Sequence, residues 1–240
     1  MPATGKSLLL SLRNVVETLA VSAPTLADAT RGRLSRDVTN ARIASWSARV
    51  VENAAVSLRV RGRENVEPGV TYVVMSNHQS HYDVAILFHV LGPNMRMVAK
   101  KELFALPVFG PALEKAGFVS VDRGDTAAAI ASLAQAKAHL ASGMHLWIAP
   151  EGTRSPSGAL LPFKKGGFHL ALDVTAPILP ITISGTRDVL RAKGVLSRAG
   201  VDVALTIHPA VATSSYAGTD RKTAVEVLSR DVRTAIASAL

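Results

Sequence analysis

Apolar and polar positions along the chain separate short strands from longer helices. Seven apolar runs have the length and composition of buried strands, at about 56–61, 71–76, 95–99, 118–122, 145–149, 178–184 and 203–208. Helical spacing recurs between them, near 83–91, 107–116, 125–142, 166–174 and 220–238. Strands that alternate with helices predict an α/β fold with a mostly parallel central sheet flanked by helices.

The first 60 residues differ from this pattern and predict two helices, at about 6–22 and 38–55. Pro24 and the basic loop 31–33 should separate them, because proline interrupts a helix. The second helix carries an apolar stripe, formed by Ile43, Trp46, Val50, Ala54 and Leu58. Such a stripe fits an interfacial membrane helix and equally a helix packed on the core. We therefore divide the chain into an N-terminal two-helix appendage, residues 1–60, and a main domain, residues 61–240.

Composition narrows the classes of partner and of chemistry. The 240 residues contain no cysteine, which excludes disulfides, a thiol nucleophile and thiolate metal sites. Lys and Arg number 27 against 18 Asp and Glu, giving a net charge of +9. This excess favours an anionic partner, which could be nucleic acid, an anionic membrane or a phosphorylated substrate. Aromatic residues make up only 5%, which argues against a surface that stacks bases.

The chain shows no sequence signal for crossing or leaving through a membrane. No run approaches 18 consecutive apolar residues, so we expect no transmembrane helix. Three leucines at 8–10 follow Lys6, but Arg13 and Glu17 interrupt the run too early for a signal peptide. We therefore expect a cytoplasmic protein.

The stretch from Ser76 to Asp83 joins a predicted strand to a predicted helix, where α/β folds commonly place their chemistry. Ser80 and Asp83 have the spacing of a capping box, with Ser80 as N-cap and Asp83 at the third helical position. From there the Asp83 carboxylate can reach one ring nitrogen of His78. The other nitrogen would then be free to act as a general base. Alternatively, His78 is an ordinary loop residue and Asp83 only a capping acid.

Two further stretches place cations beside strand ends. Lys100 and Arg123 each lie close to the end of a predicted strand. A third strand runs into Pro150-Glu151-Gly152-Thr153-Arg154, which could be a simple turn. It could also clamp a phosphate, through the Arg154 fork and the backbone N–H groups of Gly152 and Thr153.

Taken together, these stretches resemble the lysophosphatidate acyltransferase family, the 1-acyl-sn-glycerol-3-phosphate acyltransferases. Asn-His-x-Ser-x-x-Asp at 77–83 is similar to its first motif, and the Lys100–Arg123 block to its second. Pro-Glu-Gly-Thr-Arg-Ser at 150–155 is similar to its third motif, and the strand start at 176–181 to its fourth. The resemblance covers about residues 70–185. It departs from the family at Ala149, where a bulky residue is usual. The alanine removes packing volume behind the site, which bears on the choice of acyl chain or acceptor.

The resemblance implies an O-acyltransferase of phospholipid biosynthesis. Its donor would be acyl-CoA or acyl-carrier protein as co-substrate, and its acceptor a lysophospholipid, most simply 1-acyl-glycerol-3-phosphate. His78 would be the base and Asp83 its orienting partner, and neither a metal nor a cofactor is expected. The residues assigned to substrate binding are Lys100, Arg123, Glu151, Gly152, Thr153 and Arg154. The sequence does not identify the oxyanion donors, for which Lys100 and backbone N–H groups near the motif turns are candidates.

The resemblance also implies association with an anionic membrane surface, on its cytoplasmic face. Other readings stay open from the sequence alone. The chain could acylate a different lysolipid or glycolipid, or it could be a non-catalytic membrane-binding protein on the same scaffold. Nucleic-acid binding is not expected, because the charge comes with no recognised motif. A serine acyl-enzyme is also disfavoured, since Ser80 is better used as a helix cap.

Overall fold

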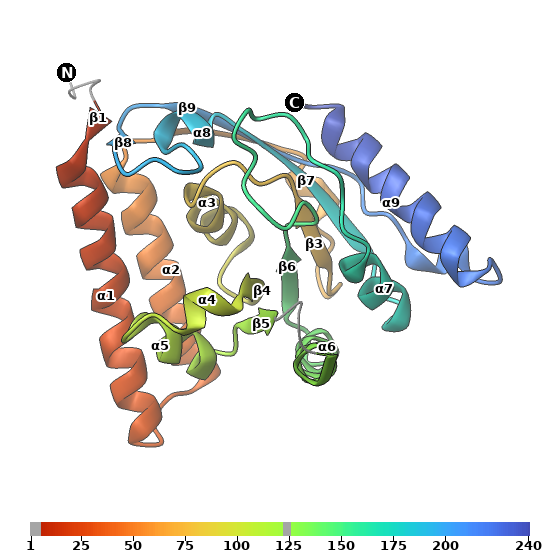
Figure 1. Ribbon diagram of the computed structural model, residues 1–240, viewed down its shortest axis with the longest axis horizontal. Helices are drawn as coiled ribbons and strands as arrows, with labels where there is room; N and C mark the ends of the chain where they lie inside the picture. Colours follow the sequence, from red (N-terminus) through yellow and green to blue (C-terminus); the bar gives the residue numbers. More distant parts are fainter. Residues whose placement is uncertain (1–5, 122–125) are drawn as a thin grey trace.

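A seven-stranded sheet forms the centre of the computed structural model, which describes residues 6–121 and 126–240 (Figure 1). The strand order is β2-β9-β7-β3-β6-β4-β5. The strands are β2 (Ser57–Arg61), β3 (Val73–Ser76), β4 (Met95–Lys100), β5 (Val119–Val121), β6 (His145–Ile148), β7 (Ile178–Ser184) and β9 (Asp202–Ile207). Neighbours pair in parallel except β7 with β9. The predicted mostly parallel sheet is therefore confirmed.

Helices cover both faces of this sheet. Side chains alternate between the faces along each strand, so each face carries apolar side chains that a helix can bury. In β3, Val74 joins one apolar cluster while Val73 and Met75 join the other. The first cluster is covered by α1 (Leu8–Thr30), α2 (Arg36–Asn53), α3 (Tyr82–Leu91), α4 (Lys101–Phe104), α5 (Phe109–Lys115) and α8 (Thr186–Val189). The second is covered by α6 (Thr126–Ala141), α7 (Gly166–Asp173) and α9 (Arg221–Ala237).

The structure corrects the predicted end of the first helix. α1 continues through Pro24 to Thr30, and the chain turns at Arg31 and Gly32. Proline lacks an N–H group, so the carbonyl of Ala20 loses its usual helical partner. Ala20 and Pro24 are both exposed, and water can satisfy that carbonyl. A proline on the solvent side of a helix therefore does not end it here.

The N-terminal hairpin is packed on the main domain along its inner face. Ile43, Val50 and Val51 of α2 are buried in the same cluster as Val74 of the central strand. The apolar stripe of the second helix therefore belongs to the core. Apolar side chains on the outer face of α1 are instead exposed, with Leu9 at 77% and Val16 at 63%. No helix in the described ranges has both the length and the apolarity needed to cross a bilayer.

A short antiparallel pair, which the sequence did not predict, fixes the start of α1. It joins β1 (Lys6–Ser7) to β8 (Ser197–Arg198). Ser7 caps the helix, since its side chain accepts a hydrogen bond from the Leu10 N–H at 3.2 Å. Ser11 and Ser197 connect their hydroxyls across the pair at 2.9 Å. The pair therefore ties the beginning of the hairpin to a segment almost 190 residues later.

His208, for which the sequence suggested no role, joins the last helix to the sheet. The Thr182 hydroxyl donates to the backbone carbonyl of Ile236 at 2.6 Å. A hydroxyl has one proton, so Thr182 Oγ1 must accept from His208 Nε2, which lies 2.8 Å away. Burial lowers the pKa of His208, which favours the neutral ring that this arrangement needs. The three groups together hold α9 against β7.

Candidate active site

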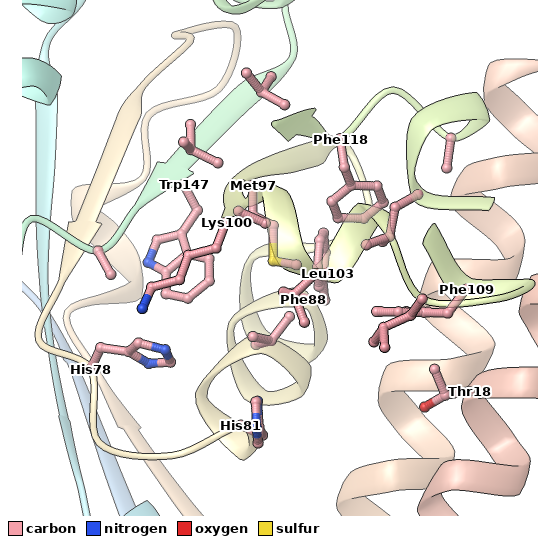
Figure 2. Close-up of a pocket in the computed structure, with 18 of the residues that line it drawn as sticks. Thr18, His78, His81, Phe88, Met97, Lys100, Leu103, Phe109, Phe118 and Trp147 are labelled. Carbon is pink, nitrogen blue, oxygen red and sulfur yellow. The ribbon is translucent and has the colours of Figure 1, made fainter. Parts of the chain in front are cut away.

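The predicted site residues gather where β3, β6 and β4 end at one edge of the sheet. His78 follows β3, Lys100 ends β4, and Glu151 to Arg154 follow β6. A cavity of about 1740 Å³ opens at this edge, and its wall includes His78, Lys100 and Arg154. Figure 2 shows the Lys100 side chain extending toward the His78 ring, with apolar side chains that include Phe88 and Phe118 to the right of them.

The contact predicted between His78 and Asp83 is present. Nδ1 of His78 lies 2.7 Å from Oδ2 of Asp83, whose side chain is fully buried. The same oxygen accepts the backbone N–H groups of Gln79 at 2.7 Å and Ser80 at 2.9 Å. A carboxylate only accepts, so Nδ1 carries the ring proton and Nε2 has a free lone pair. The arrangement is that of an oriented general base.

The helix that carries Asp83 begins one residue later than the predicted capping box places it. α3 starts at Tyr82, which makes His81 rather than Ser80 the residue before it. Half of the predicted capping box still forms, because Asp83 accepts the Ser80 N–H. The Ser80 hydroxyl is used differently, since it donates to the Leu190 carbonyl at 2.8 Å. Ser80 is thus committed to the protein frame, in agreement with the view that it is no nucleophile.

Glu151 holds the backbone of His78. Its Oε1 accepts the His78 N–H at 2.8 Å, and its Oε2 accepts the Leu161 N–H at 2.8 Å. The residue is only 3% exposed. Burial raises the pKa of Glu151, while the two N–H groups act in the opposite direction. The sequence grouped Glu151 with the substrate-binding residues, whereas in the structure both of its oxygens face the protein.

The other backbone group of His78 is held as well. The Ser155 N–H donates to the His78 carbonyl at 2.7 Å, so the third motif fixes both sides of this residue. Asn77 anchors the preceding position, because its side-chain amide exchanges two hydrogen bonds of 2.8 Å with the backbone of Ile183. His78 therefore stands on a loop that neighbouring strands hold rigidly.

Trp147 is a residue of the site that sequence reasoning missed. Its ring lies edge-to-face with His78, with centroids 5.6 Å apart and planes at 85°. The indole N–H donates to the Ser76 hydroxyl at 3.0 Å, which fixes the ring against the end of β3. Trp147 and Ala149 lie two positions apart and so share one side of the strand. This spacing was the signal for Trp147 in the sequence, since it places the bulky Trp147 on the same side as the small Ala149.

The groups predicted to bind a phosphate differ in how available they are. Arg154 is half-buried and lines the cavity, and among the described residues its guanidinium has no hydrogen-bond or ion-pair partner. Burial lowers the pKa of Arg154, and the Asp83 charge opposes that shift. Thr153 is exposed at the cavity wall, whereas the Gly152 N–H already donates to Ala149 at 2.9 Å. That N–H is thus unavailable for a phosphate in this turn. Arg123 lies outside the described residues.

His81 lies beside the pair formed by His78 and Asp83. It lines the cavity and reaches solvent there. Surrounding protein and the Arg154 charge nevertheless lower its pKa to about 4, with His78 acting in the same direction. The His81 ring is therefore neutral near pH 7 and adds no charge beside His78.

Comparison with known proteins places this site in a family. The Acyltransferase family model matches residues 57–184, more than half of the chain. The chain belongs to the Acyltransferase family. A human protein named 1-acyl-sn-glycerol-3-phosphate acyltransferase beta is 30% identical over 201 residues, which are 83% of this chain and 72% of that protein. The family resemblance seen in the motifs is therefore confirmed.

Other members of the family agree in name and in fold. The human 1-acyl-sn-glycerol-3-phosphate acyltransferase alpha is 39% identical over 134 residues, 55% of this chain and 47% of that protein. The chain spans about half the length of the first curated relatives it matches. The crystal structure of PlsC, the 1-acyl-sn-glycerophosphate acyltransferase of Thermotoga maritima, is 26% identical. It superposes with a TM-score of 0.74 and covers 95% of each chain.

Proposed function

We propose that the chain transfers a fatty acyl group from a thioester donor to the free hydroxyl of a lysophospholipid, and that this acceptor is 1-acyl-glycerol-3-phosphate. The observation that carries the proposal is the pair formed by His78 and Asp83 at the wall of a large, mainly apolar cavity. The names of the relatives support the choice of acceptor. The product would be phosphatidate.

The reaction begins with proton transfer to His78. Nε2 takes the proton of the acceptor hydroxyl, and the oxygen attacks the thioester carbonyl carbon. The C–O bond forms, a tetrahedral oxyanion appears, and the C–S bond then breaks. His78 returns the proton to the departing thiolate, so the enzyme ends as it began. Asp83, held by two backbone N–H groups, stabilises the imidazolium between these steps.

The backbone near His78 offers few donors for the oxyanion. The N–H groups of residues 78, 79 and 80 are bound to Glu151 or Asp83, and those of Gly152 and Ser155 to carbonyls. Lys100 is exposed at the cavity wall, and its amino group extends toward His78 (Figure 2). We therefore assign Lys100 to the oxyanion, where a preorganised cation acts on the developing charge.

Arg154 is the candidate for the acceptor phosphate. Its planar fork matches two phosphate oxygens, and it lines the same cavity as His78. Binding the phosphate there would bring the hydroxyl of the same molecule to His78. Thr153 lies next to it in the cavity wall, and Arg123 stays a proposed partner from the sequence alone. Glu151 acts from behind, through the His78 backbone.

The apolar part of the cavity suits the acyl chain. Its volume of about 1740 Å³ exceeds the roughly 300–1,000 Å³ of a typical small-molecule pocket. Side chains from α1, α2, α3 and α5 line it, including Trp46, Phe88 and Phe109, and Phe118 joins them from just before β5. The N-terminal hairpin is thereby part of the substrate site. The thioester donor would be acyl-CoA or acyl-carrier protein.

A product screen tests the proposal. Purified protein would be incubated with several lysolipids and with both donors, and the products identified by mass spectrometry. We expect phosphatidate from lysophosphatidate, and loss of at least ~10²-fold in kcat for His78→Ala with the fold retained. His89→Ala is a matched control, since this exposed histidine in the last turn of α3 does not line the cavity. Product from another lysolipid alone would change the acceptor, and no product at all would favour a non-catalytic binding protein.

We further propose that the protein is peripheral on an anionic membrane surface, on the cytoplasmic side. Six apolar side chains of α1 are exposed, and they are Leu8, Leu9, Leu12, Val15, Val16 and Leu19. Four of them also line the cavity, whereas Leu9 and Val16 lie outside it on the outer face of the helix. Burying them in the interface would release apolar area from water. The net charge of +9 adds attraction to anionic lipid.

Point substitutions test this surface better than truncation, because removing residues 1–60 would also uncover the core and the cavity. The variant carrying Leu9→Ser and Val16→Ser should bind anionic vesicles more weakly, and wild-type binding should fall as salt rises. Leu240→Ser serves as a control at a residue that is 51% exposed and follows α9, outside the hairpin and the cavity lining. Equal vesicle binding by wild type and the α1 variant would contradict the proposal.

A further inference from the structure

A second, smaller cavity lies at the opposite edge of the sheet from His78. Its volume is about 250 Å³, and it borders the first residues of α2 and the segments that lead into β4 and β6. The lining residues are Leu34, Ser35, Arg36, Thr39, Arg96, Lys115, Ala116, Gly117, His139, Ser142 and Met144. The set includes three cations and a histidine but no carboxylate. Nothing in the proposed acyl transfer uses this cavity.

Arg96 forms the floor of the cavity and is the most unusual of these residues. It is only 2% exposed. Its guanidinium donates to three carbonyls, those of Ala116 at 2.6 Å, Pro93 at 3.1 Å and Met95 at 2.7 Å. Its Nη2 donates one of two protons to the Asn40 side-chain oxygen at 3.1 Å. All four acceptors are neutral, so the charge is solvated by dipoles but not neutralised.

The other cations stand at the rim. Arg36 is exposed, and it is fixed by hydrogen bonds to Asn94 Oδ1 at 2.6 Å and to the Ser142 carbonyl at 3.1 Å. Lys115 is exposed, and it has no ion pair within the described part of the chain. His139 Nε2 lies 2.6 Å from the Gly117 carbonyl, so this nitrogen carries its ring proton.

The charged groups of this cavity lie close enough together to shift one another's pKa. Burial and the nearby Arg36 lower the pKa of Arg96 to about 10. Burial also lowers the pKa of His139, and the charges of Arg96 and Arg36 act in the same direction. Like charges held together in a concave site raise the local concentration of anions. An anion would also compensate the buried Arg96 charge, which no residue in the described ranges does.

We propose that this basic pocket, the cavity lined by Arg36, Arg96, Lys115 and His139, binds the phosphate group of a small anion. Arg36 and Lys115 contact the anion from the rim, and the remaining Nη2 proton of Arg96 meets it from the floor. Several N–H donors directed at one site favour a phosphate, which has several acceptor oxygens, over a monovalent halide. The bound phosphate group could belong to free phosphate or to a lipid headgroup.

The first test is a calorimetric titration with sodium phosphate and with pyrophosphate, at constant ionic strength. Because Arg154 is a second candidate for phosphate, all proteins carry Arg154→Gln. In that background Lys115→Gln and Arg36→Gln should each weaken phosphate binding about tenfold, the usual loss for one charge-assisted hydrogen bond. Lys222→Gln, an exposed lysine on α9, is the matched control and should leave binding unchanged.

The second test uses phosphatidylcholine vesicles with and without phosphatidate, to separate a lipid headgroup from a free anion. A phosphatidate-dependent increase in binding that Lys115→Gln removes and Lys222→Gln retains supports the pocket with a lipid source. Loss in the soluble titration alone supports it with a free anion. If Lys115→Gln and Arg36→Gln match the Lys222→Gln control in both tests, the basic pocket is no phosphate site and the proposal fails.

Discussion

Replacing Glu151 by glutamine separates a positioning role from a substrate-binding role. The substitution keeps the shape of the side chain and removes its charge. Glu151 accepts two backbone N–H groups, from His78 and Leu161, each at 2.8 Å. A glutamine has one oxygen, so it can satisfy only one of them and turns its own N–H₂ toward the other. With the site 3% exposed, no water readily fills the gap.

The magnitude follows from these contacts. Hydrogen bonds to a charged group contribute roughly 1.5–3 kcal/mol each. Burial raises the pKa of Glu151, so removing the charge returns part of its desolvation cost and places the net loss near the lower end. We expect the free energy of unfolding to fall by about 1.5–2 kcal/mol. For a domain of this size that is a decrease of roughly 3–8 °C in Tm.

Catalysis should fall with it, because the freed N–H belongs to His78. A displacement of about 1 Å in a catalytic group costs on the order of 10²-fold in rate. We therefore expect kcat to drop by roughly 10–10²-fold, with the acceptor KM almost unchanged. Urea denaturation and steady-state kinetics measure the two effects. Glu226→Gln is the control, since its ion pair with Lys165 is exposed and contributes about 0–1 kcal/mol. A raised acceptor KM with unaltered stability would instead assign Glu151 to substrate binding and refute this reasoning.

Three further outcomes are expected. Asp83→Asn should lower kcat by roughly 10²–10⁴-fold and the free energy of unfolding by about 1 kcal/mol, measured by kinetics beside melting, and full activity would contradict the role given to the pair. Arg154→Lys should raise the acceptor KM, lower kcat and leave the donor KM unchanged, and it should reduce the preference for lysophosphatidate over monoacylglycerol, which wild type must show. Burial lowers the pKa of His81, His139, His145 and His208 below the ordinary 6.5, so the unfolded chain takes up more protons than the folded one as the pH falls. Tm should therefore fall as pH drops below about 6.5, and less steeply in His208→Gln. A Tm that is flat from pH 7 to 5 would exclude this linkage.

The parts of the site that sequence reasoning located are local ones. His78 and Asp83 are five positions apart on a strand-to-helix junction, so their contact depends only on the turn between them. Lys100 and Arg154 stand beside strand ends, and parallel strands end at a common edge. The strands themselves were predicted because their apolar runs are short and bounded by turn residues.

The parts that were missed depend on pairs far apart in the sequence. Glu151 meets the His78 N–H across 73 positions, and Trp147 meets the His78 ring across 69 positions, so neither contact has a local pattern. A carboxylate in a family motif suggests a group that binds substrate, whereas Glu151 accepts two backbone N–H groups of the protein itself. The end of α1 was misplaced for a different reason, since the effect of Pro24 depends on which side of the helix faces water.

The place of β2 in the sheet has a consequence for how the protein is made. β2 follows the N-terminal hairpin, and its partner among the described strands is β9, which ends at Ile207. At the usual rate of about 5–20 residues per second, roughly 7–30 s of translation separate the two strands. Until β9 emerges, β2 has no neighbour to pair with. During this interval β3 to β7 emerge while β2 stays unpaired, so the open edge of β2 and the apolar outer face of α1 are both exposed. A nascent chain would need a chaperone or a nearby bilayer to avoid aggregation.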